Sequence, residues 1–175
     1  MENIEKYDVP ALEFVFQESS KFLEETLKSF RESINKSFIV LAVYSGFMPY
    51  CFEKIANGNF ELTTIIYVVI FLGSLVSLII ILPNLLPSQM NFQGTEPDKL
   101  INEYFEQEIF KEQQRKQMLR VKIQDHQTAI FENKQNISIR VRRFKISIFV
   151  FITFLVISLY FGLGIWFFIR KSFQP

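Results

Sequence analysis

Residues 62–82 read LTTIIYVVIFLGSLVSLIIIL, and this stretch contains no charged side chain. It holds about 20 residues, so as an α-helix it would extend roughly 30 Å, which is the thickness of the hydrocarbon core of a bilayer. Pro83 and Pro87 follow it and mark the end of the helix. We therefore expect a transmembrane helix at this position.

Two more apolar stretches accompany this segment. Residues 146–169, ISIFVFITFLVISLYFGLGIWFFI, are also uncharged, and Trp166 is the kind of side chain that anchors a helix at the membrane surface. The stretch 37–52, SFIVLAVYSGFMPYCF, is shorter than the other two and contains Gly46 and Pro49. We expect a short, kinked span there, with a re-entrant or interfacial helix as the alternative. The sequence thus predicts an all-α integral membrane protein with three transmembrane helices, the first one short.

The composition excludes several classes of function. The 19 Lys and Arg residues nearly balance the 18 Asp and Glu residues, so we expect no DNA binding through a broad basic surface. One Cys and one His argue against a disulfide framework and a zinc site, and we expect no metal or cofactor. The two long spans lack ionisable side chains, which argues against an energised transporter. The chain also has no Walker loop, nucleophile elbow or H-E-x-x-H motif, so we expect no enzymatic activity.

The Lys and Arg residues are distributed unevenly around the three spans. Most lie in the N-terminal arm and in residues 83–145, and few lie in residues 53–61 or after residue 169. Because loops rich in Lys and Arg stay in the cytoplasm, we expect both long polar regions on that side. The first apolar run starts only after residue 36, so we expect no signal peptide. The predicted protein is multi-pass with a cytoplasmic N-terminus.

This arrangement predicts five consecutive parts. They are a cytoplasmic amphipathic helix over residues 1–36, a transmembrane hairpin over 37–82, a cytoplasmic linker and long helix over 83–145, a transmembrane helix over 146–169, and a short tail over 170–175. The linker and long helix are expected to be continuous with the last span.

Local signals place the two polar helices. Asp8 and Pro10 form a helix start, and apolar residues recur every three or four positions from Leu23 to Phe38, so the arm should be a helix that runs into the first span. Thr95, followed by Pro97 and Asp98, predicts the start of the long helix.

The long helix carries a heptad-like apolar seam. Its members are Leu119, Ile123, His126, Ile130, Asn133, Ile137, Val141 and Phe144. Such a seam must be covered, so it predicts packing on the N-terminal helix, on a second copy, or on both, and we expect a homo-oligomer. His126 and Asn133 either fix the register of the seam or lie at its edge in water.

Two sets of side chains are candidate binding or catalytic groups. Arg120 and His126 fit the loose R-x(4–6)-H pattern of HEPN ribonucleases, although six residues on one helix place the two side chains about 120° apart. The plainer interpretation is a solvated Arg and a seam His. The basic run of Arg115, Lys116, Arg120 and Lys122 is a candidate phosphate or acidic-partner site, against the plainer interpretation of a solvated helix face.

Two further sets relate to the membrane. Four basic residues precede the last span and are expected to contact anionic lipid headgroups: Arg140, Arg142, Arg143 and Lys145. Small residues inside the spans are candidates for close helix packing: Gly73, Ser74, Ser77, Gly162 and Gly164.

Three stretches carry a resemblance to known proteins. They are ESINKSFIVLAVYSG (residues 32–46), the exit ILPNLLPSQMNF (81–92) and DHQTAIFENKQNISIRVRRFKISIFVF (125–151). Their order resembles the Pycsar effector family of small bacterial anti-phage membrane proteins and, more loosely, the SLATT-type membrane proteins. The resemblance is architectural and covers nearly the whole chain. It implies a cytoplasmic sensor joined to helices that perturb the bacterial inner membrane when a nucleotide, or here a partner defence protein, signals infection.

Three functions follow as hypotheses. The first is an oligomeric inner-membrane effector of anti-phage defence that acts by pore formation or depolarisation. The second is a membrane-anchored accessory or HEPN-like ribonuclease subunit of an RNA-guided or reverse-transcriptase defence system. The third is a holin-like or structural membrane protein.

Overall fold

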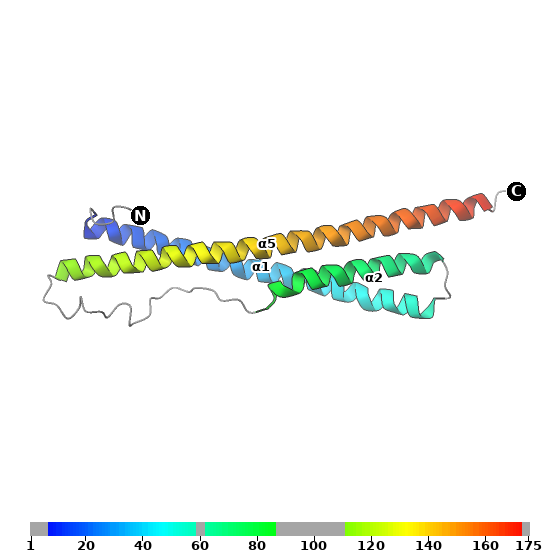
Figure 1. The fold of residues 1–175 in the computed structure, drawn as a ribbon, viewed down its shortest axis with the longest axis horizontal. Helices are drawn as coiled ribbons and strands as arrows, with labels where there is room; N and C mark the ends of the chain where they lie inside the picture. The colour runs from blue at the N-terminus through cyan, green and yellow to red at the C-terminus, as the bar shows by residue number, and fades with distance from the viewer. Residues whose placement is uncertain (1–6, 59–61, 87–110, 173–175) are drawn as a thin grey trace. The chain divides into compact units, whose positions relative to one another are not determined.

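The structure, a computed structural model, describes residues 7–58, 62–86 and 111–172. These residues are almost entirely helical and include no β-strand. The elements are α1 (Val9–Asn57), α2 (Leu62–Ile81), the short 3-10 helix η2 (Leu82–Asn84) and α5 (Lys111–Ser172), as Figure 1 shows. The all-helical fold predicted from the sequence is confirmed, and three of these helices are long and apolar enough to cross a membrane.

The chain divides into two compact units. Of the described residues, unit 1 contains 7–32 and 111–138, and unit 2 contains 33–58, 62–86 and 139–172. The helices α1 and α5 each contribute one stretch to both units, whereas α2 and η2 belong to unit 2 alone.

Helix α1 begins where the sequence predicts. The Asp8 carboxylate accepts a hydrogen bond of 3.1 Å from the backbone N–H of Ala11, which is the usual N-cap contact, and Pro10 occupies the first turn. The helix then runs without a break through residues 37–52 to Asn57, with Pro49 inside it. The arm and the first apolar stretch are therefore one helix, while a kink at Pro49 stays a prediction.

The end of α2 is also set by its sequence. Pro83 has no backbone N–H and follows directly after Ile81 and Leu82, so the chain tightens into η2. The turn closes with a 3.0 Å hydrogen bond from the N–H of Leu85 to the carbonyl of Leu82. This agrees with the expected exit of the span.

Helix α5 is a single helix from Lys111 to Ser172. It joins the polar stretch before residue 139 to the apolar stretch 146–169, as the sequence analysis expected. The predicted start of the long helix at Thr95 and Pro97 lies outside the described residues.

In unit 1, the first part of α1 lies along the first part of α5. Figure 1 shows the blue end of α1 beside the yellow-green part of α5, and Leu12, Leu23 and Ile123 are buried in this pair. The two helices of the pair run in the same direction, because Glu13 contacts Arg115, and Ser19 contacts His126 further along both helices. The pair therefore packs as a parallel two-helix arrangement.

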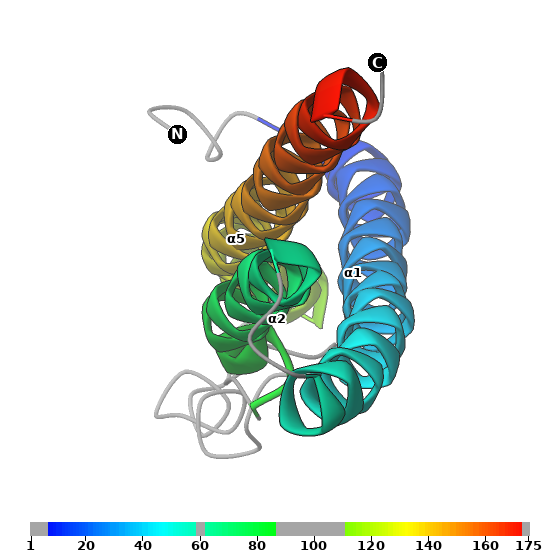
Figure 2. The same ribbon diagram turned by 90° about the vertical axis from the view of Figure 1, so that its right-hand side faces the viewer.

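Unit 2 contains three packed helix segments. Figure 2 shows α2 beside the cyan end of α1 and below the orange-red end of α5. Tyr44, Ile81 and Phe151 form the core, with the rings of Tyr44 and Phe151 4.8 Å apart. The outer surface is apolar, since Ile39, Ile79 and Phe149 are each exposed over more than half of their surface. Such a surface suits a lipid environment.

Candidate functional site

Four polar residues recur at intervals of seven along α5 and are all buried. They are His126, Asn133, Arg140 and Ser147, and each is 6% exposed or less. Residues seven apart lie on the same face of a helix, so this spacing forms a continuous polar line on the side of α5 that other helices cover. Buried polar groups need hydrogen-bond partners, and those partners define the candidate site.

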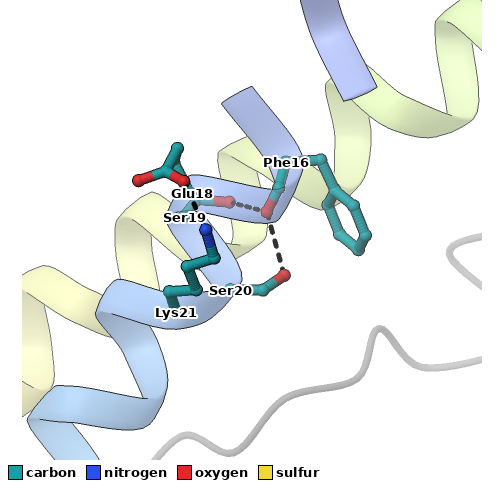
Figure 3. A network of polar contacts seen from close by, with 5 residues as sticks. All are labelled: Phe16, Glu18, Ser19, Ser20 and Lys21. Carbon is teal, nitrogen blue, oxygen red and sulfur yellow. Dashed lines mark hydrogen bonds and ion pairs between the residues drawn. The ribbon is translucent and has the colours of Figure 1, made fainter. Parts of the chain in front are cut away.

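His126 belongs to unit 1 and is held by α1. Its Nδ1 lies 3.0 Å from the Ser19 hydroxyl, and its ring stacks on the ring of Phe16 with centroids 5.1 Å apart. The Ser19 hydroxyl donates its one hydrogen to the Phe16 carbonyl at 2.8 Å, so it accepts from an Nδ1–H of His126. Figure 3 shows the bonds of Ser19 and Ser20 to that carbonyl.

The surroundings of His126 favour the neutral ring. Burial lowers the pKa of His126 below its ordinary value of 6.5, and the positive charge of Lys122 lowers the pKa further, while Asp125 acts in the opposite direction. The ring is only 6% exposed. The pairing of Arg120 with His126 as a catalytic set stays a prediction.

The basic run of the sequence analysis is partly engaged with α1. Arg115 forms an ion pair with Glu13, and the Lys122 ammonium lies 5.5 Å from the centroid of the Phe16 ring. Lys116 and Arg120 are partly buried. At least two of its four side chains, Arg115 and Lys122, therefore contact α1.

The seam residues up to Ile137 lie at the surface that α5 shares with α1 in unit 1. Ile123, His126 and Asn133 are buried, and three further members in this unit are partly buried: Leu119, Ile130 and Ile137. The N-terminal helix of the same chain thus covers part of the seam. Packing of a second copy stays a prediction.

Arg140 is buried, unlike the exposed headgroup contact that the sequence predicts. It is 5% exposed, and its guanidinium donates to the carbonyl of Asn84 and, at 3.2 Å, to the carbonyl of Leu86. The Asn84 amide in turn donates to the Arg140 carbonyl at 2.9 Å and reaches the Ser37 hydroxyl at 3.5 Å. Residues from α1, η2 and α5 therefore meet in one buried polar cluster, which we call the Arg140 cluster.

The neighbours of Arg140 face outward. Arg142, Arg143 and Lys145 are exposed, so their predicted contact with lipid headgroups stays a prediction. Val141, which the sequence analysis placed in the seam, is 37% exposed, because the buried position at this level belongs to Arg140.

A second cluster surrounds Ser147 within the apolar part of unit 2. The Ser147 hydroxyl lies 3.1 Å from the Tyr44 hydroxyl and donates to the Ser77 carbonyl at 2.9 Å. The contacts join α5 to α1 and to α2. Hydrogen bonds of this kind orient helices in an apolar environment.

The small residues predicted for helix packing fall into different surroundings. A Cβ atom placed on Gly73 would lie 2.4 Å from the Cβ of Phe154, so α2 and α5 approach each other closely there. Ser74 and Ser77 are buried. A Cβ on Gly162 would lie 3.5 Å from Ile66, whereas one on Gly164 would have no described atom within 4 Å.

Comparisons with known protein families, with curated proteins and with solved structures find no match to this chain. Within the described ranges, no three His, Cys, Asp or Glu side chains gather in a way that could hold a metal ion. The fold and the clusters therefore define the chain as an all-helical protein with three helices able to cross a membrane.

Proposed function

We propose that this chain is a membrane effector in which unit 1 receives a signal, α5 passes it to unit 2, and the helices of unit 2 then perturb the membrane. The observation that carries the proposal is α5 itself. It is one helix of 62 residues, about 90 Å at the usual rise, and it belongs to both units. A continuous helix moves as a rigid element, so a displacement at one end reaches the other.

The proposal includes an orientation and an assembly. Unit 1 lies in the cytoplasm together with the N-terminus, and unit 2 lies in the bacterial inner membrane as a multi-pass bundle. The uneven distribution of Lys and Arg supports this orientation. A homo-oligomer is part of the proposal, because perturbing a membrane by a pore requires more helices than one copy supplies.

The signal is proposed to act on the α1–α5 pair of unit 1. Arg115 and Lys122 both contact α1, through Glu13 and Phe16. A nucleotide phosphate or an acidic segment of a partner protein would compete for these two cations and loosen the pair. The assignment to anti-phage defence rests on the resemblance to the Pycsar effectors alone.

Two alternative functions are a HEPN-like ribonuclease and a holin-like protein. A HEPN-like ribonuclease needs an accessible His, and His126 is buried against Phe16, so we do not propose this activity. A holin-like protein would need no signal, and the test below separates it from a gated effector.

Membrane potential tests the proposal. Cells that express the chain are followed with a voltage-sensitive dye, with and without phage infection. For the unaltered chain we expect depolarisation only on infection. The double variant R115Q/K122Q lacks both contacts with α1, so it should depolarise uninfected cells, while the exposed-site control K28Q should behave like the unaltered chain. Depolarisation of uninfected cells by the unaltered chain would indicate a holin-like protein, and protection from phage without depolarisation would overturn the effector and favour an accessory role.

A further inference from the structure

The end of α2 and the middle of α5 hold each other in the Arg140 cluster. The Arg140 guanidinium binds the carbonyls of Asn84 and Leu86, and the Asn84 amide binds the carbonyl of Arg140. Each side chain thus binds the backbone of the other segment. Such a reciprocal contact fixes both the distance between the segments and their register.

The chemistry of the two groups makes the contact strong. Asn84 is the last residue of η2 and Leu86 lies just beyond it, where no further helical turn supplies N–H donors, and a cation near the C-terminal end of a helix is favoured by the helix dipole. The guanidinium supplies a fork of donors that matches two carbonyls at once, and its charge makes each bond stronger than a neutral one. Arg140 therefore completes the hydrogen bonding at the exit of α2.

The cluster also contains one buried polar atom without a hydrogen-bond partner in the described part of the chain. The side-chain oxygen of Asn84 is buried and, among the described residues, has no hydrogen-bond partner. An incoming water molecule would satisfy this oxygen and could solvate the Arg140 cation at the same time. Separation of Arg140 from Asn84 would therefore open this oxygen and the guanidinium to water.

The position of Arg140 on α5 makes it sensitive to movement. It lies just inside unit 2, seven residues before Ser147, whose contacts join α5 to α1 and α2. A shift or rotation of α5 that separates the guanidinium from the two carbonyls would open the cluster and would also displace Ser147 on the same helix.

We propose that Arg140 and Asn84 form a latch that holds the three helices of unit 2 together, and that release of this latch turns the membrane activity on. The second half of this proposal rests on the proposed function, whereas the first half concerns the bundle alone. Arg140 and Asn84 are positioning residues in this mechanism, since they act by holding helices in place.

The test uses Cys51 as a reporter of bundle opening. It is the one cysteine of the chain and is 1% exposed, within unit 2. Labelling of the full-length protein by N-ethylmaleimide in isolated membranes measures how often the bundle opens. We expect R140A and N84A to label about tenfold faster than the unaltered chain, because each loses buried hydrogen bonds of the cluster.

Two further variants make the result interpretable. R140K keeps the charge but cannot fork to both carbonyls, so we expect intermediate labelling, and it serves with N84A if R140A fails to insert. K36M removes an exposed positive charge one residue from Ser37 and should label like the unaltered chain. Equal labelling of all variants in folded, inserted protein would overturn the latch.

Membrane potential in the same cells separates the two halves. Fast labelling together with depolarisation of uninfected cells supports the whole proposal. If the variants label fast but do not depolarise uninfected cells, while infected cells with the unaltered chain do depolarise, the switching role is overturned. If the variants label fast but infected cells with the unaltered chain keep their potential, the latch is upheld and the proposed function is overturned.

Discussion

Gly73 is a position where one added carbon atom should change the bundle. A Cβ there would lie 2.4 Å from the Cβ of Phe154, and neither atom can rotate away because both are fixed to helix backbones. We expect G73A to lower the free energy of unfolding by about 1–3 kcal/mol, the usual cost of overpacking.

Thermal unfolding in detergent, followed by circular dichroism, measures this loss. The matched control is G164A, because a Cβ at Gly164 has no described atom within 4 Å. Alanine favours a helix over glycine, so G164A should be as stable as the unaltered chain or slightly more stable. Equal stability of the two variants would show that α2 and α5 do not meet closely at Gly73.

At the same scale, Arg140 shows where sequence reasoning reaches its limit. The interval of seven from His126 to Asn133 continues to Arg140 and Ser147, and all four are buried. The charge of Arg140 predicts a position at the surface, and the apolar spacing predicts Val141 as the seam residue at this level. The partners that allow burial are the carbonyls of Asn84 and Leu86, which come from a distant part of the sequence. Periodicity on α5 contains no information about them.

At the scale of the helices, the pairing of α1 with α5 in unit 1 should depend on pH. Burial and Lys122 lower the pKa of His126 in the folded protein below 6.5, its ordinary value. The unfolded chain then binds more protons than the folded one at acidic pH, so the stabilising contribution is complete above pH 6.5 and is lost as the pH falls from 6.5 to the folded pKa.

The chain has a single histidine, so this effect can be assigned. We expect the thermal unfolding midpoint of the unaltered chain to fall between about pH 7.5 and about pH 5.5 by more than that of H126Q, whose side chain does not titrate there. The same pH dependence in both proteins would exclude His126 as its source.

The helices themselves were largely predictable. Uncharged stretches of about 20 residues, the Asp8 cap and Pro83 give the bounds of α1 and α2 closely, since each acts on the local backbone. The continuity of α5 into residues 146–169 followed from its apolar spacing. Which helix would cover the seam could not be predicted, because α1 and a second copy offer the same kind of apolar face.

At the scale of the whole molecule, unit 2 has many polar side chains in its interior, beside its apolar core, and an apolar outer surface. Its buried residues include Ser37, Ser74, Ser77, Asn84, Arg140, Ser147 and Ser158. In a bilayer the lipid tails are as apolar as the side chains of the helices, so the hydrophobic effect does not drive the helices together. They associate through close packing at small residues and through hydrogen bonds. The Ser147 and Arg140 clusters are interactions of this kind, and they support placing unit 2 in the membrane.

The orientation of the chain decides whether unit 1 can receive a cytoplasmic signal, so its topology is the measurement to make. In a C51S background, single cysteines at the exposed positions Asn57 and Lys111 are treated in intact cells with a maleimide that cannot cross the inner membrane. We predict that N57C is labelled at once and K111C only after the cells are permeabilised. Labelling of K111C in intact cells, or protection of N57C, would contradict a cytoplasmic unit 1 coupled through α5 to a bundle in the membrane.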